Sequence, residues 1–212
     1  MKSCWYLLLA ALCFSCSEHP EQVAASPASP APPFRDSNLT PRAPLAQGPS
    51  VPDISPMDVI YFPLDYPVLK MTQKAKTLPV VRVIYSRPHK QGRKIFGELI
   101  AFGEPWRLGA NEATEIEFFQ SVQIQNKVVA AGRYVLYCIP ESAQWTIVFN
   151  SNIYSWGLKP DAAKDVQRFT IPTSKTERAY EFFTMSFENA KYGTSLTMSW
   201  DDVTARLPIT IQ

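Results

Sequence analysis

The chain has 212 residues, of which 46% are hydrophobic, 12% aromatic and 19% charged. Lysine and arginine total 21 and aspartate and glutamate 19, so the formal net charge is +2. A balance this close to neutrality gives no electrostatic reason to expect nucleic acid as a partner. The apolar and aromatic content is also too high for a wholly disordered chain.

The N-terminal residues have the pattern of an export signal. Lys2 supplies one early positive charge, and the apolar stretch after it is shorter than the roughly 20 residues of a membrane-spanning helix. Ser15 and Cys16 resemble the site at which a bacterial lipoprotein is cut before a cysteine that then carries lipid. We therefore predict a lipoprotein signal peptide over residues 1–15 and lipidation at Cys16. Cleavage elsewhere, or before Cys13, is the alternative.

A lipid on Cys16 makes a membrane the first expected partner. Ser17, beside the anchor, is compatible with the outer membrane of the bacterial envelope, and the sequence leaves the periplasmic and the surface face open. Once the signal is removed, Cys138 has no partner for an internal disulfide. We expect Cys138 to be a buried, inert thiol on an apolar strand.

Residues 16–55 are rich in proline, alanine and serine, and the run from Ala24 to Pro33 has low complexity. Such a composition cannot bury enough apolar surface to order itself, so we predict a disordered tether. The remaining residues, 56–212, are enough for one domain with its own core. The predicted organisation is a signal peptide, a tether and a single domain.

Apolar residues of the domain alternate with polar ones instead of recurring every three or four positions. The strand-like segments are residues 80–85, 115–118, 122–125, 133–139, 145–149 and 166–171, with further alternation over 183–187, 196–200 and 203–211. This pattern is typical of antiparallel strands with one face in the core. It predicts an all-β fold, an antiparallel β-sandwich of about eight or nine strands, with a closed β-barrel as the alternative. A long irregular loop should separate the first two strands.

Few residues of the domain fit metal or nucleophilic chemistry. His89 is its single histidine and Cys138 its single cysteine, so zinc and haem lack ligands, and we predict no metal and no cofactor. No Gly-x-Ser-x-Gly elbow is present, and we assign no catalytic residue. A paired-carboxylate hydrolase stays open, because it needs only two acidic groups at a suitable separation. The available carboxylates are Glu112, Glu115, Glu117, Asp201 and Asp202.

The irregular segment between Tyr85 and Thr114 gathers arginines, a tryptophan and polar residues among glycines. Arginine binds carboxylates, phosphates and sugar hydroxyls, and tryptophan offers a stacking face, so the segment is a candidate ligand site. The same side chains can instead satisfy the loop itself, with Arg107 and Glu112 paired as a structural latch. The candidate ligand or latch residues are Arg87, Arg93, Trp106, Arg107, Asn111, Glu112 and Trp156.

Several motifs in this segment resemble a family of exported bacterial proteins. They are Tyr85-Ser86-Arg87-Pro88, Gly92-Arg93-x-Ile95-Phe96-Gly97 and Trp106-Arg107-x-Gly109-Ala110-Asn111-Glu112-Ala113-Thr114, with further matches at Gly132-Arg133-Tyr134, Trp145–Asn150 and Trp156-Gly157. The family is domain of unknown function 2911, and the likeness covers about residues 55–208. The resemblance implies an exported, often lipid-anchored, mostly β domain of unassigned role. It supplies no catalytic residues.

These features are compatible with three kinds of function. The first is a lipid-anchored binding or structural module of the cell envelope, with a small molecule or a glycan as ligand, which needs no catalytic group. The second is a hydrolase that acts through carboxylates on envelope or imported saccharides. Two acidic side chains facing each other beside Trp106 or Trp156 would favour it. The third is an accessory subunit that pairs with an unknown protein through an exposed strand edge.

Overall fold

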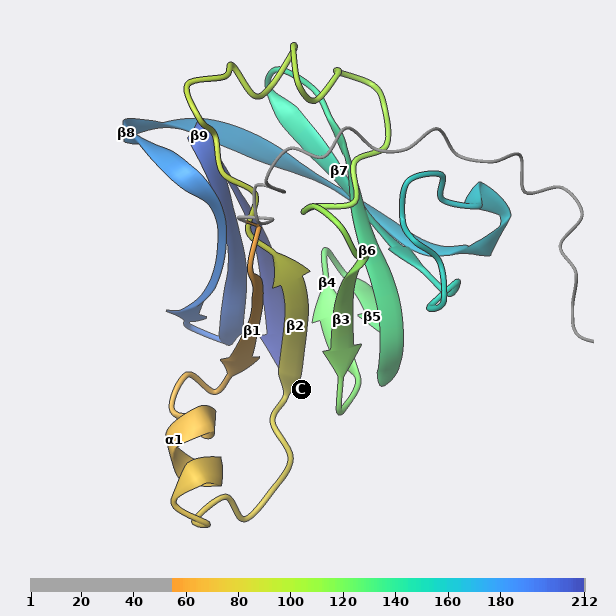
Figure 1. Ribbon diagram of the computed structural model, residues 1–212. Coiled ribbons are helices and arrows are strands. Elements are labelled where there is room, and N and C mark those ends of the chain that lie inside the picture. Colours follow the sequence, from red (N-terminus) through yellow and green to blue (C-terminus); the bar gives the residue numbers. More distant parts are fainter. Residues whose placement is uncertain (1–54, 212) are drawn as a thin grey trace, which may run out of the picture. The chain divides into compact units, whose positions relative to one another are not determined.

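The computed structural model describes residues 55–211, and Figure 1 shows their course. The predicted signal peptide, the predicted lipidation site Cys16 and all but the last residue of the predicted tether lie outside these residues. The elements are β1 (Met57–Phe62), α1 (Tyr66–Met71), β2 (Val81–Ser86), β3 (Thr114–Phe118), β4 (Val122–Ile124), β5 (Lys127–Val129), β6 (Gly132–Pro140), β7 (Gln144–Asn150), the 3-10 helix η1 (Ala162–Lys164), β8 (Asp165–Ala190) and β9 (Gly193–Ile211).

Nine antiparallel strands form one sheet in the order β1-β2-β3-β6-β7-β8-β9-β4-β5. The sheet is not closed into a barrel, because β1 and β5 remain as its two edges. The prediction of an antiparallel all-β fold of eight or nine strands is therefore confirmed, and the barrel alternative is not realised.

The sheet folds over on itself because β8 and β9 are long and bent (Figure 1). β8 pairs with β7 as far as Pro172 and with β9 from Thr173 onward, so a single strand passes from one layer to the other. Register shifts on either side of Tyr180, and a positive φ of 52° at its partner Asp201, mark the bend. Both layers of the predicted sandwich thus belong to one continuous sheet.

Aromatic rings fill the core between the two layers. Tyr85 of β2 and Phe183 of β8 meet edge to face, with 5.8 Å between ring centroids. The buried Tyr85 hydroxyl donates to the Met185 carbonyl (3.2 Å) and accepts from the Met185 N–H (2.9 Å). One phenol oxygen therefore satisfies two backbone groups of the facing layer. Cys138 is also fully buried, and burial raises the pKa of its thiol, as expected for an inert cysteine.

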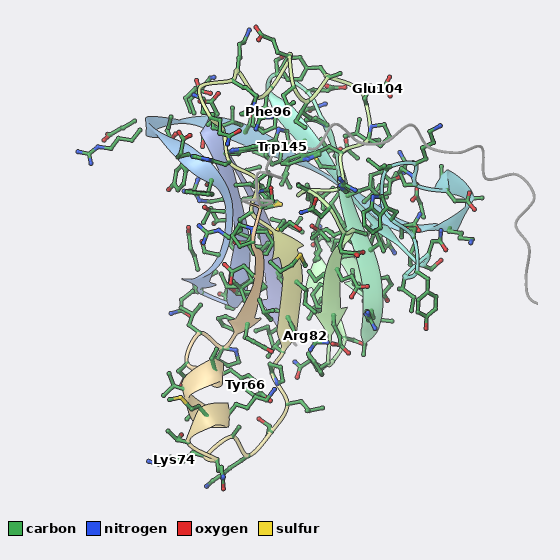
Figure 2. The ribbon with its side chains drawn as sticks, viewed as in Figure 1. Tyr66, Lys74, Arg82, Phe96, Glu104 and Trp145 are labelled. Carbon is green, nitrogen blue, oxygen red and sulfur yellow. The ribbon has the colours of Figure 1, made fainter. Side chains whose placement is uncertain are left out.

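The short elements absent from the sequence-based expectations include α1, β1 and β5. α1 and the connection after it project from one end of the sheet, and α1 buries none of its residues. Figure 2 shows Tyr66 and Lys74 at this end, and Phe96 and Trp145 at the other end, under the long loop. α1 and β1 have six residues each, too few for a period to be recognised. No helix within residues 55–211 is long and apolar enough to cross a membrane.

The Tyr85 bridge makes stability depend on pH. Burial raises the pKa of Tyr85 to about 12 from its usual 10.0. At pH values between the two, the unfolded chain releases the phenol proton and the folded chain keeps it. The stability that Tyr85 contributes is therefore complete below pH 10 and is lost as the pH rises toward 12.

We expect Tyr85→Phe to lower the free energy of unfolding at pH 7 by about 1–3 kcal/mol, because two buried backbone groups of Met185 lose their partner. The variant should also lose less stability than the wild type between pH 7 and pH 11. Urea unfolding at both pH values measures the two effects. Tyr154→Phe, at a side chain that is 91% exposed, is the control. An equal loss with pH in wild type and Tyr85→Phe would contradict the assignment.

Candidate ligand site

Residues 87–113 connect β2 to β3 and arch over one end of the sheet (Figure 1). Backbone hydrogen bonds tie this loop to both layers. Trp106 exchanges two bonds with Cys138 of β6, with N-to-O distances of 2.7 and 2.8 Å. On the other side, the Lys90 N–H donates to the Glu181 carbonyl of β8 (2.7 Å). The irregular segment predicted from the sequence is confirmed, and it spans the opening between the two layers.

Trp106 fastens the middle of the loop to the core. Its side chain is only 6% exposed, and its ring stacks on that of Trp200 from β9, with 5.7 Å between centroids and 24° between planes. The indole Nε1 donates to the Gly109 carbonyl (3.2 Å), within the same loop. A buried tryptophan contributes most when its N–H has such a partner. Trp106 therefore orders the turn that follows it as well as filling the core.

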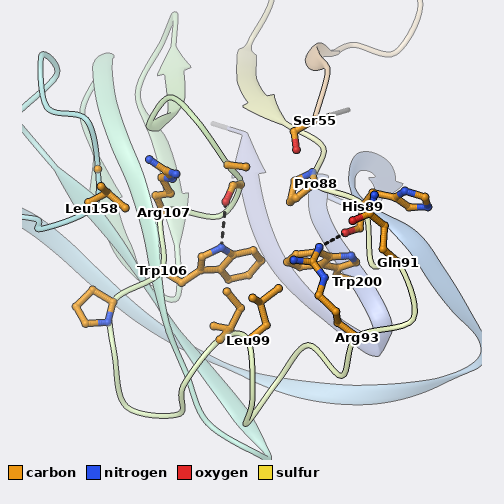
Figure 3. A pocket seen from close by; sticks show the side chains of 15 residues that line it. Ser55, Pro88, His89, Gln91, Arg93, Leu99, Trp106, Arg107, Leu158 and Trp200 are labelled. Atoms are coloured by element: carbon orange, nitrogen blue, oxygen red, sulfur yellow. Dashed lines mark hydrogen bonds between the residues drawn. The ribbon is translucent and has the colours of Figure 1, made fainter. Parts of the chain in front are cut away.

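The loop, β9 and the segment after β7 surround a cavity of about 640 Å³. Figure 3 shows Trp106 and Trp200 in its middle, Arg93 and His89 on one side and Arg107 on the other. No aspartate or glutamate of residues 55–211 lines this cavity. Its apolar lining comes from Pro88, Leu99, Ile100, Pro105, Ala110 and Leu158. Apolar walls with a few convergent polar groups are typical of small-molecule sites.

Arg93 is held by the backbone of its own loop. Its Nε donates to the Lys90 carbonyl (2.9 Å), and its Nη2 donates to the His89 carbonyl, the bond drawn in Figure 3. The side chain is exposed and lines the cavity. Carbonyl oxygens orient a guanidinium and leave its net charge in place, so Arg93 presents a cation to the cavity.

Arg107 links the loop to the segment after β7. Its Nη1 donates to the carbonyls of Asn111 (2.5 Å) and Trp156 (3.3 Å), and the guanidinium carbon lies 6.0 Å from the centroid of the Trp156 ring. Burial lowers the pKa of Arg107 below its usual value, and the negative charge of Glu112 opposes this effect. The latch contacts of Arg107 are thus made to carbonyls, and Glu112 acts on it only through space.

Arg87 lies away from the cavity. Its Nε donates to the Phe183 carbonyl (3.4 Å) and its Nη2 to the Thr184 hydroxyl (3.2 Å), both on β8. Its Nη1 is 3.7 Å from the carboxylate of Asp58 on β1. Arg87 therefore links β1 and the end of β2 to the facing layer.

A second, smaller hollow of about 450 Å³ is lined by Glu112 and Trp156, together with Glu115 and Arg133. Asn111, the residue before Glu112, has a φ of 61°, in the left-handed region that asparagine tolerates better than most residues. The structure therefore divides the predicted cluster. Arg93, Trp106 and Arg107 line the cavity of about 640 Å³. Glu112 and Trp156 line the smaller hollow.

The carboxylates considered for a hydrolase mostly have cationic partners. The pairs are Glu115 with Arg133, Glu117 with Arg82, Asp201 with Lys90 and Asp202 with Lys175. Glu112 and Glu115 do share the hollow beside Trp156. Arg133, however, donates to both carboxylate oxygens of Glu115 (2.8 and 2.9 Å). This hollow thus does not offer the two free acidic groups that paired-carboxylate hydrolysis uses.

Two residues of the cavity were absent from the predicted site. Trp200 is 1% exposed, and its Nε1 has no hydrogen-bond partner within residues 55–211. His89 stacks on Phe182 (4.4 Å between centroids, 8° between planes). Its Nε2 lies 2.8 Å from the Glu181 carboxylate, and its buried Nδ1 has no hydrogen-bond partner in the part of the chain that the structure describes. Along the sequence Trp200 is one core-facing residue of an alternating strand among many. No local signal distinguishes it.

The site as a whole offers aromatic rings, aliphatic side chains and two guanidinium groups. Within residues 55–211, no three or more histidine, cysteine, aspartate or glutamate side chains are grouped so that they could hold a metal ion. The arrangement is therefore suited to recognising an organic ligand by hydrogen bonds, charge and ring contacts.

Comparison with known proteins assigns the chain to a family. The model of a protein family of unknown function, DUF2911, matches residues 67–209. Since this match covers more than half of the chain, the chain belongs to the DUF2911 family, as the motifs of the loop indicated. Neither the curated proteins nor the solved structures include a significant match.

The geometry of Arg107 predicts unequal effects of two substitutions. Arg107→Ala should lower the free energy of unfolding by about 1–2 kcal/mol, because two carbonyls lose a charged donor. Glu112→Ala should stay within about 0.5 kcal/mol, as expected for an exposed residue without an ion pair to Arg107. Thermal and urea unfolding of both variants measure the difference. Equal destabilisation by the two substitutions would show that an Arg107–Glu112 pair forms the latch.

Proposed function

We propose that this DUF2911 protein is a lipid-anchored binding module of the bacterial cell envelope, and that its ligand occupies the cavity beside Trp106 and Trp200. The observation that best supports a ligand is the lining of the cavity, in which Arg93 and Arg107 accompany aromatic and aliphatic side chains and no aspartate or glutamate of residues 55–211 takes part. Apolar walls with a few convergent polar groups are typical of small-molecule sites.

The size and lining of the cavity agree with this proposal. Its volume of about 640 Å³ lies within the range of roughly 300–1,000 Å³ that is usual for small-molecule sites. Trp106 and Trp200 offer aromatic surface, and Arg93 and Arg107 offer charged donors at either side. The loop that carries three of these four residues is tied to both layers of the sheet, so the site is largely formed before a ligand arrives.

Ligand binding requires fewer specific groups at the site than saccharide hydrolysis does. Recognition needs the donors and ring faces that line the cavity, whereas the hydrolase alternative needs two free carboxylates in one cleft. In the hollow beside Trp156, Arg133 already holds Glu115. In a cavity beside Trp145, Lys90 and Lys175 pair with Asp201 and Asp202. We therefore favour a binding module over a saccharide hydrolase.

The envelope location rests on the sequence. An apolar N-terminal segment that ends at Ser15 and Cys16 supports cleavage and acylation at Cys16. Residues 16–55 would then separate the anchor from the domain, which would meet its ligand outside the cytoplasm.

Filling the cavity should abolish ligand binding. In a thermal-shift screen of the full chain against organic acids, glycans and peptides, we expect at least one class to raise the melting temperature. The shift should disappear in Ala110→Trp and Leu158→Trp, which place an indole into the cavity from two sides. Ala163→Trp, on the exposed η1, is the control and should keep the shift.

Two outcomes of this screen would contradict the cavity as the binding site. One is that no compound of any class stabilises the wild type. The other is that the shift survives in both cavity-filling variants. A cooperative melting transition of each variant shows that it is still folded.

Substitution of the acylation site tests the anchor. Cys16→Ser in the full precursor should move the protein from the membrane fraction to the soluble fraction and abolish incorporation of labelled fatty acid, because no thiol remains to be acylated. Cys13→Ser is the control and should remain in the membrane. The opposite behaviour of the two variants would place the anchor at Cys13, and retention of both would refute lipid anchoring at either cysteine.

A further inference from the structure

The arginines of the domain differ in whether a carboxylate accompanies them. Residues 55–211 contain eight arginines, and five of these form ion pairs, namely Arg82, Arg87, Arg133, Arg168 and Arg206. The three that form none within the described residues are Arg93, Arg107 and Arg178. Two of these three line the cavity, and Arg178 lies on the exposed face of β8. Most of the arginines without an ion pair within residues 55–211 are therefore found at the cavity.

Each of the two cavity arginines keeps hydrogen-bonding capacity in reserve. All bonds that Arg107 makes within the described residues come from Nη1, so its Nε and Nη2 remain available. Arg93 uses Nε and Nη2 and keeps Nη1. Carbonyl oxygens hold both guanidinium groups in place, which lowers the entropy that a ligand would lose in ordering them.

The partial burial of Arg107 adds an energetic reason for an anionic ligand. Burial lowers the pKa of its guanidinium, and the charge of Glu112, which acts only through space, opposes this effect. A cation that has lost water without gaining a counter-ion is poorly satisfied. An anion inside the cavity would supply the counter-ion that Arg107 lacks within the described residues.

Among residues 55–211, Arg93 and Arg107 are the only arginine, lysine, aspartate or glutamate side chains that line the cavity. Guanidinium nitrogens only donate hydrogen bonds. A neutral sugar would leave both guanidinium groups without a counter-charge. A carboxylate or a phosphate supplies that charge and matches guanidinium geometry in two-point contacts.

From the two arginines without ion pairs, the lack of a lining carboxylate among residues 55–211 and the apolar walls of one cavity, we infer that it binds an organic oxyanion. The ligand carries a carboxylate or phosphate group on an apolar or aromatic body. The inference rests on the proposed function and narrows it to a class of ligand. Charge recruits the anionic group to the arginines, and Trp106, Trp200 and the aliphatic lining contact the body.

Calorimetric titration of the full chain in detergent with four small probes tests the inference. Benzoate and phenyl phosphate are the anionic probes, whereas benzyl alcohol and phenyl β-glucoside carry the same ring without charge. We expect both anions, or the preferred one of them, to bind at least about tenfold more tightly than the neutral probes, as a charged hydrogen bond predicts. The stronger anion identifies a carboxylate or a phosphate as the recognised group. Binding should weaken with added salt.

Charge variants assign the effect to the two arginines. Arg93→Gln and Arg107→Gln should each weaken anion binding by about tenfold. Arg93→Lys loses the same carbonyl contacts as the glutamine variant and retains the charge, so it should recover most of the affinity. Arg178→Gln removes an equally unpaired arginine outside the cavity and should bind as the wild type does. A melting curve for every variant separates loss of binding from loss of folding.

Three results would overturn the inference. They are equal binding of neutral and anionic probes, anion binding that Arg93→Gln and Arg107→Gln leave unchanged, and equal weakening by Arg178→Gln. If neutral probes bind and Ala110→Trp abolishes that binding, the cavity is a binding site for uncharged ligands, and only the oxyanion inference fails. If no probe binds and the broad screen also finds no ligand, the proposed function fails with it.

Discussion

The seating of Trp106 in the core is the interaction on which the rest of this structure depends. Its backbone pairs with Cys138 of β6, its ring stacks on Trp200 of β9, and its indole N–H closes the turn at Gly109. These contacts fix the middle of a loop that has no strand of its own over residues 87–113. Without them, the loop would not be held over the opening between the two layers, and the arginines on either side of Trp106 would have no defined position.

The loop held by Trp106 places the guanidinium groups of Arg93 and Arg107 beside the apolar lining of the cavity. Five other arginines of the domain are paired with carboxylates, as Arg133 is with Glu115. At the cavity, Arg93 and Arg107 bond to carbonyls and keep their charge. Because a partly buried cation without a counter-ion costs free energy, Arg107 makes the protein less stable than an ion pair at the same place would. An anionic ligand that accepts hydrogen bonds from these arginines would recover that free energy on binding.

The fold was predictable from the sequence wherever the signal is local. Alternation places β2, β3, β4, β6 and β7 within one or two residues, because each of these strands has one face in the core. It could not show that residues 166–171 and 183–187 belong to one strand, since that continuity depends on pairing with β9 across the bend near Tyr180. The loop motif pointed to Arg107 as a site residue. Trp200 was beyond reach, because β9 brings it to the loop from far along the chain.

The central claim is that a ligand occupies the cavity lined by Trp106 and Trp200. Heteronuclear NMR resolves the tryptophan indole N–H signals one by one, so a titration with benzoate or phenyl phosphate can follow each of them. The account predicts that the Trp106 and Trp200 signals shift as the ligand contacts their rings, while the Trp156 signal, from a ring that does not line this cavity, moves far less. A titration that shifts Trp156 and leaves Trp200 in place would contradict the account.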